Sequence, residues 1–213
     1  HADESVTVTD NGRGIPVGPH PTEKLPVIEL IFTRLHSGGK FDKGSGSAYK
    51  FAGGLHGVGV SVSNALSTRL ECEVMREGHN FSIAFESGAL AQKLKKTGGA
   101  KQSGTRIRLW PDAKFFDSGA ITVAELERAL RARAVLLPGV RLSLTIEKTA
   151  ETKTWNYPDG LSGYLTEQLN GHELLVPLFP GEKYIADGSG SDFAEGEGAA
   201  WVVGWSESGN VVR

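Results

Sequence analysis

The chain has 213 residues, and 23 lysine and arginine residues against 25 aspartate and glutamate residues give a net charge of −2. This balance excludes a generally basic nucleic-acid coat, though not a local basic patch. The single cysteine, Cys72, excludes an internal disulfide framework and a cysteine-rich zinc site. No apolar run approaches the roughly 20 residues that a membrane helix needs, and no charged-then-apolar leader is present. We therefore expect a cytoplasmic protein without a membrane partner.

Apolar periodicity predicts a mixture of strands and helices. Alternating, β-branched segments predict strands at residues 5–9, 69–76, 80–86, 105–110, 141–147 and 201–205. Helical spacing predicts helices at residues 22–35, 60–66, 122–136 and 159–169, and the glycine-rich segments 36–50 and 187–198 are interpreted as loops. Thr122 with Glu125 three residues later indicates an N-terminal cap for the third helix. The order predicts an α+β fold, a two-layer sandwich of helices on a mostly antiparallel sheet.

Glycine is concentrated in clusters that suggest close approach of the backbone to a ligand. There are 28 glycines, about twice the average usage of roughly 7%. Gly54, Gly57 and Gly59 directly precede a predicted helix, whose unpaired N–H groups favour an anion. Their spacing matches neither GxGxxG nor the P-loop, and Lys40 lies in a separate glycine loop. For one such cluster alone, a tightly packed loop is the simpler interpretation.

Asp10 directly follows the first predicted strand and begins the sequence Asp-Asn-Gly. Its carboxylate could accept a hydrogen bond from an exocyclic amine, and a charged hydrogen bond contributes roughly 1.5–3 kcal/mol. The same sequence is also typical of an ordinary Asx turn. From these residues alone both interpretations stay open.

Taken in order, the clusters resemble one known family. The segments 10–16 (DNGRGIP), 35–41 (LHSGGKF) and 53–67 (GGLHGVGVSVSNALS), with Gly104-Thr105 and Trp110-Pro111-Asp112 downstream, are similar to the GHKL-type ATPase region of bacterial type II topoisomerases. Segments 115–118 (FFDS) and 157–161 (YPDGL) look more like the B subunit of topoisomerase IV than that of gyrase. The resemblance implies the GHKL (Bergerat) fold at residues 1–171, without its N-terminal helix, and the beginning of an α/β transducer domain at residues 172–213.

The resemblance also implies roles for individual residues. Asp10 would bind the adenine amino group of ATP, with Thr105 near the same ring through a water. Lys40 would approach the γ-phosphate, and residues 54–60 would surround the triphosphate. The implied ATP-binding residues are Asp10, Gly14, Ile15, Pro16, Lys40, Gly54, Leu55, His56, Gly57, Val58, Gly59, Val60 and Thr105. Coumarin-type inhibitors would dock at the pocket mouth, on Arg13, Pro16 and Arg76.

The implied activity is attack of water on the γ-phosphate of ATP with Mg²⁺ present. ATP-driven homodimer closure would serve strand passage of double-stranded DNA, in a heterotetramer with the DNA-cleaving A subunit of topoisomerase IV. It would act in the nucleoid, for decatenation and relaxation; supercoiling by a gyrase is the alternative. The family's water-activating Glu and Mg²⁺-binding Asn lie on a helix upstream of these motifs. No residue here is therefore assigned as catalytic or as a metal ligand, and we expect little turnover.

Three alternatives stay open. The chain could bind adenine ligands or inhibitors without hydrolysing ATP, and the upstream position of the catalytic Glu favours this. It could belong to another GHKL class: a chaperone, a mismatch-repair ATPase or a histidine kinase. A structural role would leave the glycine clusters and Lys40 unexplained.

The basic residues Arg128, Arg131 and Arg133 of the third helix are interpreted as a solvated face rather than a DNA contact.

Overall fold

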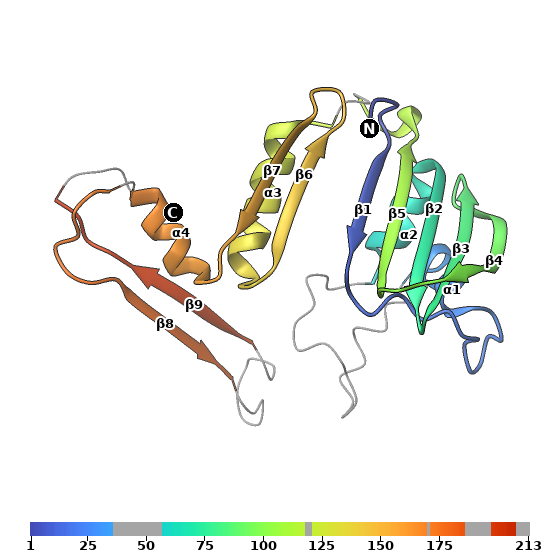
Figure 1. Cartoon of the computed structure of the whole chain (residues 1–213), viewed down its shortest axis with the longest axis horizontal. Coiled ribbons are helices and arrows are strands. Elements are labelled where there is room, and N and C mark those ends of the chain that lie inside the picture. Colours follow the sequence, from blue (N-terminus) through green and yellow to red (C-terminus); the bar gives the residue numbers. More distant parts are fainter. Residues whose placement is uncertain (36–56, 118–120, 170, 186–196, 208–213) are drawn as a thin grey trace. The chain divides into compact units, whose positions relative to one another are not determined.

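The computed structural model describes residues 1–35, 57–117, 121–169, 171–185 and 197–207. The chain divides into two compact units, His1–Ala120 and Ile121–Arg213. The first contains β1 (Val6–Asp10), α1 (Val27–Thr33), α2 (Gly59–Ala65), β2 (Ser67–Arg76), β3 (His79–Glu86), β4 (Ala89–Gly99), β5 (Gly104–Pro111) and the 3₁₀ helix η1 (Ala113–Phe115) (Figure 1). The second contains α3 (Val123–Leu136), β6 (Arg141–Ile146), β7 (Glu151–Asn156), α4 (Gly160–Leu169), β8 (Phe179–Tyr184) and β9 (Gly198–Val203). The predicted α+β class is confirmed.

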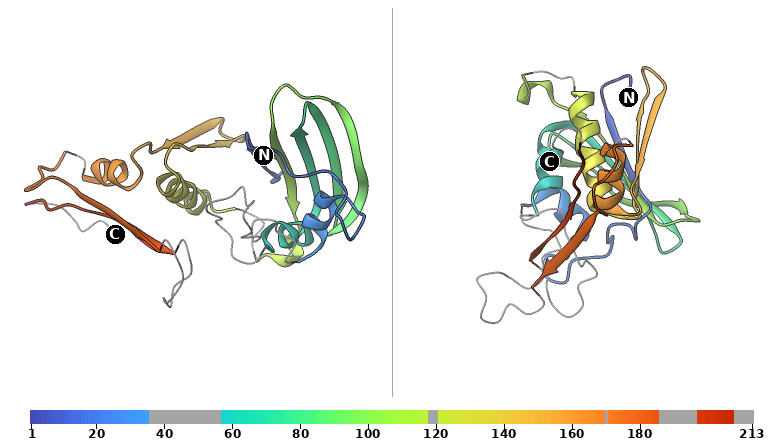
Figure 2. Two further views of the ribbon diagram at one scale, coloured as in Figure 1. Left: turned by 90° about the horizontal axis from the view of Figure 1, so that it is seen from below. Right: turned by 90° about the vertical axis from the view of Figure 1, so that its left-hand side faces the viewer.

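The first unit is built on a five-stranded sheet in the order β1-β5-β2-β3-β4, and every neighbouring pair is antiparallel. Helices α1 and α2 lie against one face of this sheet (Figure 2). Between the helices and the sheet lies a cluster of buried apolar side chains, which we call the buried cluster and to which α1 contributes Ile28 and Phe32. The Phe32 and Phe85 rings stack with centroids 5.1 Å apart. Burial of each such side chain contributes about 1.5–3 kcal/mol. The remaining buried members come from β2 and β3: Leu70, Cys72, Val74, Ile83 and Phe85.

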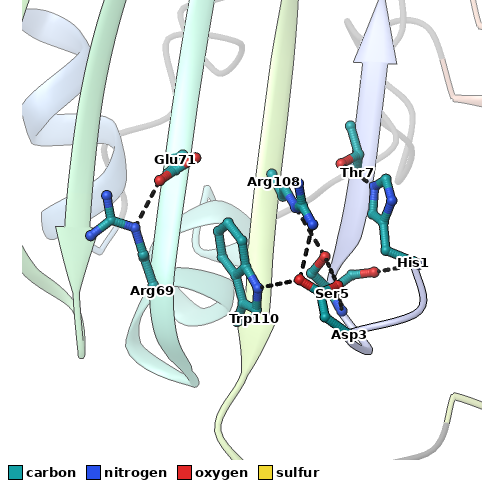
Figure 3. Close-up of polar contacts among 8 residues, drawn as sticks. All are labelled: His1, Asp3, Ser5, Thr7, Arg69, Glu71, Arg108 and Trp110. Atoms are coloured by element: carbon teal, nitrogen blue, oxygen red, sulfur yellow. Dashed lines mark hydrogen bonds and ion pairs between the residues drawn. The ribbon is translucent and has the colours of Figure 1, made fainter.

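The other face of the sheet carries charged side chains, as expected for a half-buried antiparallel sheet with alternating residues. Its ion pairs join Arg69 to Glu71 and Glu86, Arg106 to Glu73, and Arg108 to Asp3. At one end, Asp3 accepts hydrogen bonds from the Ser5 hydroxyl at 2.6 Å and from Trp110 Nε1 at 3.0 Å (Figure 3). These hydrogen bonds, from Ser5 first and then Trp110, hold the pKa of Asp3 well below its usual value. They fasten the segment before β1 to β5.

The second unit contains two hairpins, β6–β7 and β8–β9, and the helices α3 and α4. Ala134, Val135 and Tyr157 form its buried cluster. The Tyr157 hydroxyl donates to Glu167 at 2.6 Å and accepts from Arg131 Nε at 3.0 Å. Burial and the Glu167 carboxylate raise the pKa of Tyr157. This network ties α3 to α4.

The predicted elements mostly agree with the structure, with three kinds of difference. The helix expected at 22–35 spans only Val27–Thr33, since His20 N bonds to Leu25 O and holds the preceding residues in a turn. Strands β4, β7 and β8 were not predicted; β4 has the sequence ALAQKLKKTGG, whose only β-branched residue is Thr97. The predicted cap was wrong in detail, because Thr122 occupies the N-cap position but its side chain forms no capping hydrogen bond.

The sequence also led to predictions about domain limits, loops and membrane-spanning segments. The two compact units separate between Ala120 and Ile121, and a domain boundary after residue 171 stays a prediction. The predicted loop at 36–50 and most of the one at 187–198 lie outside the described residues. In the part of the chain that the structure describes, no helix has the length and hydropathy needed to cross a membrane.

Candidate functional site

Residues predicted to bind adenine or an inhibitor lie at the same end of three neighbouring antiparallel strands. Asp10 is the last residue of β1, Thr105 the second of β5 and Arg76 the last of β2. Because β5 lies between β1 and β2, Asp10 pairs with Thr105, which pairs in turn with Val74. Residues separated by up to 95 positions in the sequence thus lie close together at one end of these strands.

The carboxylate of Asp10 is held by two backbone donors. Its Oδ1 accepts from the N–H of Gly12 at 2.8 Å and from the N–H of Thr105 at 3.2 Å. The first bond is the Asx turn that the sequence allowed, and the second fixes the carboxylate against β5. Within the described residues no hydrogen bond to Oδ2 is formed. This oxygen can therefore accept a hydrogen bond from a ligand.

Two glycines let the backbone pack closely around Asp10. Gly14 has φ +76°, and a Cβ there would lie 2.7 Å from the carbonyl oxygen of Met75. At Gly104 a Cβ would lie 2.2 Å from the carbonyl oxygen of Asp10 itself. Since ordinary carbon–oxygen contacts are longer than 3 Å, neither position has room for a side chain. The loop after β1 consequently packs directly onto β2 and β5.

The structure also places the residues expected at the pocket wall and mouth. Arg76 Nη1 donates to the carbonyl oxygen of Gly14 at 2.8 Å, and its Nε lies 2.9 Å from Glu77. Ile15 packs against the buried cluster of the sheet, whereas Pro16 and Arg13 are exposed in the same loop. The structure therefore brings Gly14 and Arg76 together, and their roles at a pocket wall and mouth stay predictions.

Only part of the predicted phosphate-binding segment is described. Gly57 has φ +62°, and Gly59 begins α2. Val58 precedes α2 as its N-cap residue, and Val60 lies in its first turn and is exposed. Lys40, Gly54, Leu55 and His56 lie outside the described residues.

Sequence reasoning missed one residue that positions α2. Asn64 is 1% exposed, and its Nδ2 donates to the carbonyl oxygens of Phe32 at 3.0 Å and Gly88 at 3.1 Å. These bonds tie α2 to the end of α1 and to the turn between β3 and β4. An asparagine inside a helix is disfavoured unless its side chain has a specific partner. The presence of Asn64 within a predicted helix could therefore have indicated such a partner.

The described ionisable groups near the site bear on metal binding and on nucleophilic chemistry. Among the described residues there is no group of three or more His, Cys, Asp or Glu side chains that could hold a metal ion. Cys72 is buried; burial first, and then the charges of Glu73 and Asp10, raise the pKa of its thiol to about 12. Because the thiol is buried and its pKa is raised, we expect it to be chemically inert.

The chain is similar in sequence to the B subunits of bacterial DNA topoisomerase 4 and DNA gyrase. The chain is 44% identical over 211 residues to the B subunit of DNA topoisomerase 4 from Salmonella typhimurium and from Escherichia coli, covering 98% of this chain and 32% of each relative. It is 40% identical over 176 residues to the B subunit of DNA gyrase from Clostridium acetobutylicum, covering 83% of this chain and 27% of that protein. The chain spans about a third of the length of these curated relatives.

A solved structure shares the fold. The 43K ATPase domain of Thermus thermophilus gyrase B, in complex with an aminocoumarin, matches with a TM-score of 0.72 and 32% sequence identity. The match covers 86% of this chain and 46% of that chain. This confirms the predicted GHKL ATPase fold.

The family is shown by a sequence profile as well. Residues 1–114 match the family described as histidine kinase-, DNA gyrase B-, and HSP90-like ATPase. That segment is more than half of the chain, and it includes both Asp10 and Thr105. The resemblance to bacterial type II topoisomerases stated from the motifs is confirmed by these similarities. The chain therefore belongs to the family of histidine kinase-, DNA gyrase B- and HSP90-like ATPases.

Proposed function

We propose that this chain is the ATP-binding region of a type II DNA topoisomerase, of the topoisomerase IV branch. The observation that carries the proposal is the Asp10 carboxylate, whose Oδ1 is fixed by two backbone N–H groups while Oδ2 accepts nothing from the described residues. A carboxylate held in this way suits recognition of one exocyclic amine. The greater identity and coverage of the topoisomerase 4 relatives, compared with the gyrase relative above, favour that branch.

The described residues fit an adenine nucleotide. Oδ2 of Asp10 would accept from the adenine amino group, and the buried Thr105 would contact the same ring through a water. Gly14, Ile15 and Pro16 would form one wall of the pocket. The closeness of Gly14 to Met75 supports this role, since a side chain at this position would push the wall away from β2.

The triphosphate would extend toward the start of α2. Backbone N–H groups of Gly57, Val58, Gly59 and Val60 would bind phosphate oxygens, and Gly54, Leu55, His56 and Lys40 would complete that end. When bound, Mg²⁺ would neutralise phosphate charge during attack of water on the γ-phosphate. Because the described residues contain no carboxylate cluster, this chain's own contribution would be the nucleotide contacts rather than metal ligands.

For the whole protein, we infer ATP-driven homodimer closure and passage of double-stranded DNA together with a DNA-cleaving partner, the A subunit of topoisomerase IV, in the nucleoid. Decatenation and relaxation follow from the topoisomerase IV assignment, and supercoiling would follow from gyrase. Coumarin-type inhibitors would bind at Arg13, Pro16 and Arg76, a proposal supported by the aminocoumarin in the similar gyrase B structure.

Calorimetric titration of the 213-residue chain with a non-hydrolysable ATP analogue and Mg²⁺ tests the proposal. We expect Asp10→Asn to weaken binding by at least about 10-fold, because a charged hydrogen bond is lost. Glu73→Gln is the matched control: it removes one negative charge from the same sheet, at an ion pair with Arg106 on the charged face. Wild-type affinity in Asp10→Asn, in a chain with native circular dichroism, would overturn the assignment.

A further inference from the structure

The edge strand β4 carries a cluster of lysines. Lys93, Lys95 and Lys96 lie in β4, and Lys101 follows two residues after its end. All four side chains are exposed, and in the described part of the chain none of them forms a hydrogen bond or an ion pair. We call these four residues the β4 lysine cluster.

Among the described residues, no carboxylate forms an ion pair with this cluster. Between Glu86 and Asp112 the sequence has six basic residues and no aspartate or glutamate. Two of the six, Arg106 and Arg108, are paired with Glu73 and Asp3. The carboxylates at the two ends of β3 are also engaged by arginines, Glu86 by Arg69 and Glu77 by Arg76. The described carboxylates of the sheet therefore pair with its arginines, and none of them pairs with the lysines of β4.

The lysines of β4 lie on an edge strand and occupy both of its faces. Among the described strands, β4 is the last of its sheet and pairs with β3, where Lys95 lies opposite Ser82 and Lys96 opposite Phe81. Phe81 packs against the buried cluster, so Lys96, opposite Phe81, lies on that face of the sheet, and Lys95, opposite Ser82, lies on the other face. Lysines on an edge also discourage pairing with other sheets, but that role does not account for the missing carboxylates.

We propose that the β4 lysine cluster binds the phosphate backbone of double-stranded DNA. The proposal rests on the proposed function in a DNA topoisomerase, and it assigns this chain a DNA contact of its own. Duplex DNA carries one charge per about 1.7 Å of its axis, and lysines contact phosphates without regard to sequence. The arginines of α3 are a weaker candidate, since Arg131 is already bound to Tyr157 and Glu167.

Fluorescence anisotropy of a labelled duplex of about 20 base pairs, titrated with the 213-residue chain at several salt concentrations, tests this contact. The triple variant Lys93→Gln, Lys95→Gln, Lys96→Gln should bind at least about 10-fold more weakly at low salt. The slope of log K against log salt should fall by about 2.7, from about 0.9 per lost phosphate contact. The corresponding Lys→Arg triple keeps the charges and should bind like the wild type.

The matched control is Lys24→Gln, Lys148→Gln, Lys183→Gln, which removes three exposed lysines elsewhere. An equal loss in this control would overturn the proposal, as would an unchanged affinity in the β4 triple variant or no binding by the wild type. Polyglutamate serves as a second, acidic probe. If it bound as tightly as the duplex, the proposal would be wrong and β4 would instead suit an acidic protein partner. The ATP analogue should bind all variants equally; loss of nucleotide binding by the wild type with DNA binding intact would sink only the proposed function.

Discussion

Arg76 reaches across from the end of β2 to the loop after β1, where its Nη1 donates to the carbonyl oxygen of Gly14 over 2.8 Å. The side chain also pairs with Glu77, whose carboxylate is 75% exposed. One residue therefore joins the proposed pocket wall to a solvated ion pair. The two contacts differ in what they should contribute, because solvent weakens the exposed pair.

We expect Arg76→Ala to weaken binding of a coumarin-type inhibitor by about 10-fold, since both the charge and the Gly14 contact are lost. Glu77→Gln removes only the exposed ion pair and should change the affinity by less than about twofold. Calorimetry on both variants checks this expectation. Equal losses would mean that the Glu77 pair, and not the Gly14 contact, orients Arg76.

Gly104→Ala should destabilise the sheet beside Asp10. The new Cβ would lie 2.2 Å from the Asp10 carbonyl oxygen, so β1 and β5 must separate locally. We expect a loss of at least about 2 kcal/mol in urea unfolding and weaker nucleotide binding. Gly98→Ala in β4 is the control, because nothing lies within 4 Å of its Cβ position. A stable Gly104→Ala variant would contradict the close packing of these strands.

Asp3 should make the stability of the chain depend on acid pH. Its pKa is lowered in the folded state by hydrogen bonds from Ser5 and Trp110, so the charged form is the one that stabilises the fold. This contribution is present above the ordinary aspartate pKa of about 3.9 and is lost as pH falls below it. Thermal melts from about pH 2 to pH 6 should show a smaller acid-side decrease in Tm for Asp3→Asn than for the wild type. Parallel curves would show that these bonds do not favour the carboxylate.

Cys72 should be unreactive in the folded protein. With a thiol pKa of about 12 and a buried side chain, almost no thiolate is available near neutral pH. A disulfide reagent such as DTNB should label the native chain very slowly and the urea-unfolded chain at once. Because the chain has a single cysteine, the signal has one source. Fast labelling of the native protein would indicate frequent opening of the sheet.

Local sequence patterns were enough to identify the family, the α+β class and most of the helices and central strands. Alternation in the segment around Cys72 reflects a strand with one buried face, and the Asp10 to Pro16 motif requires its glycines for backbone geometry. The Asx turn at Asp10 is likewise a short-range hydrogen bond that residue types reveal. Each of these features depends on neighbours within a few positions of the chain.

The meeting of distant groups, by contrast, became known from the tertiary structure alone. The bond from Thr105 to Asp10 and the contact of Arg76 with Gly14 depend on β5 lying between β1 and β2, an order that periodicity does not encode. The ties from Asn64 to α1 and to the β3–β4 turn are equally non-local. Residue propensities did not predict strand β4, because it is stabilised by pairing with β3 and has few β-branched residues. The same pairing places Lys95 and Lys96, in a sequence of net charge −2, on an edge strand.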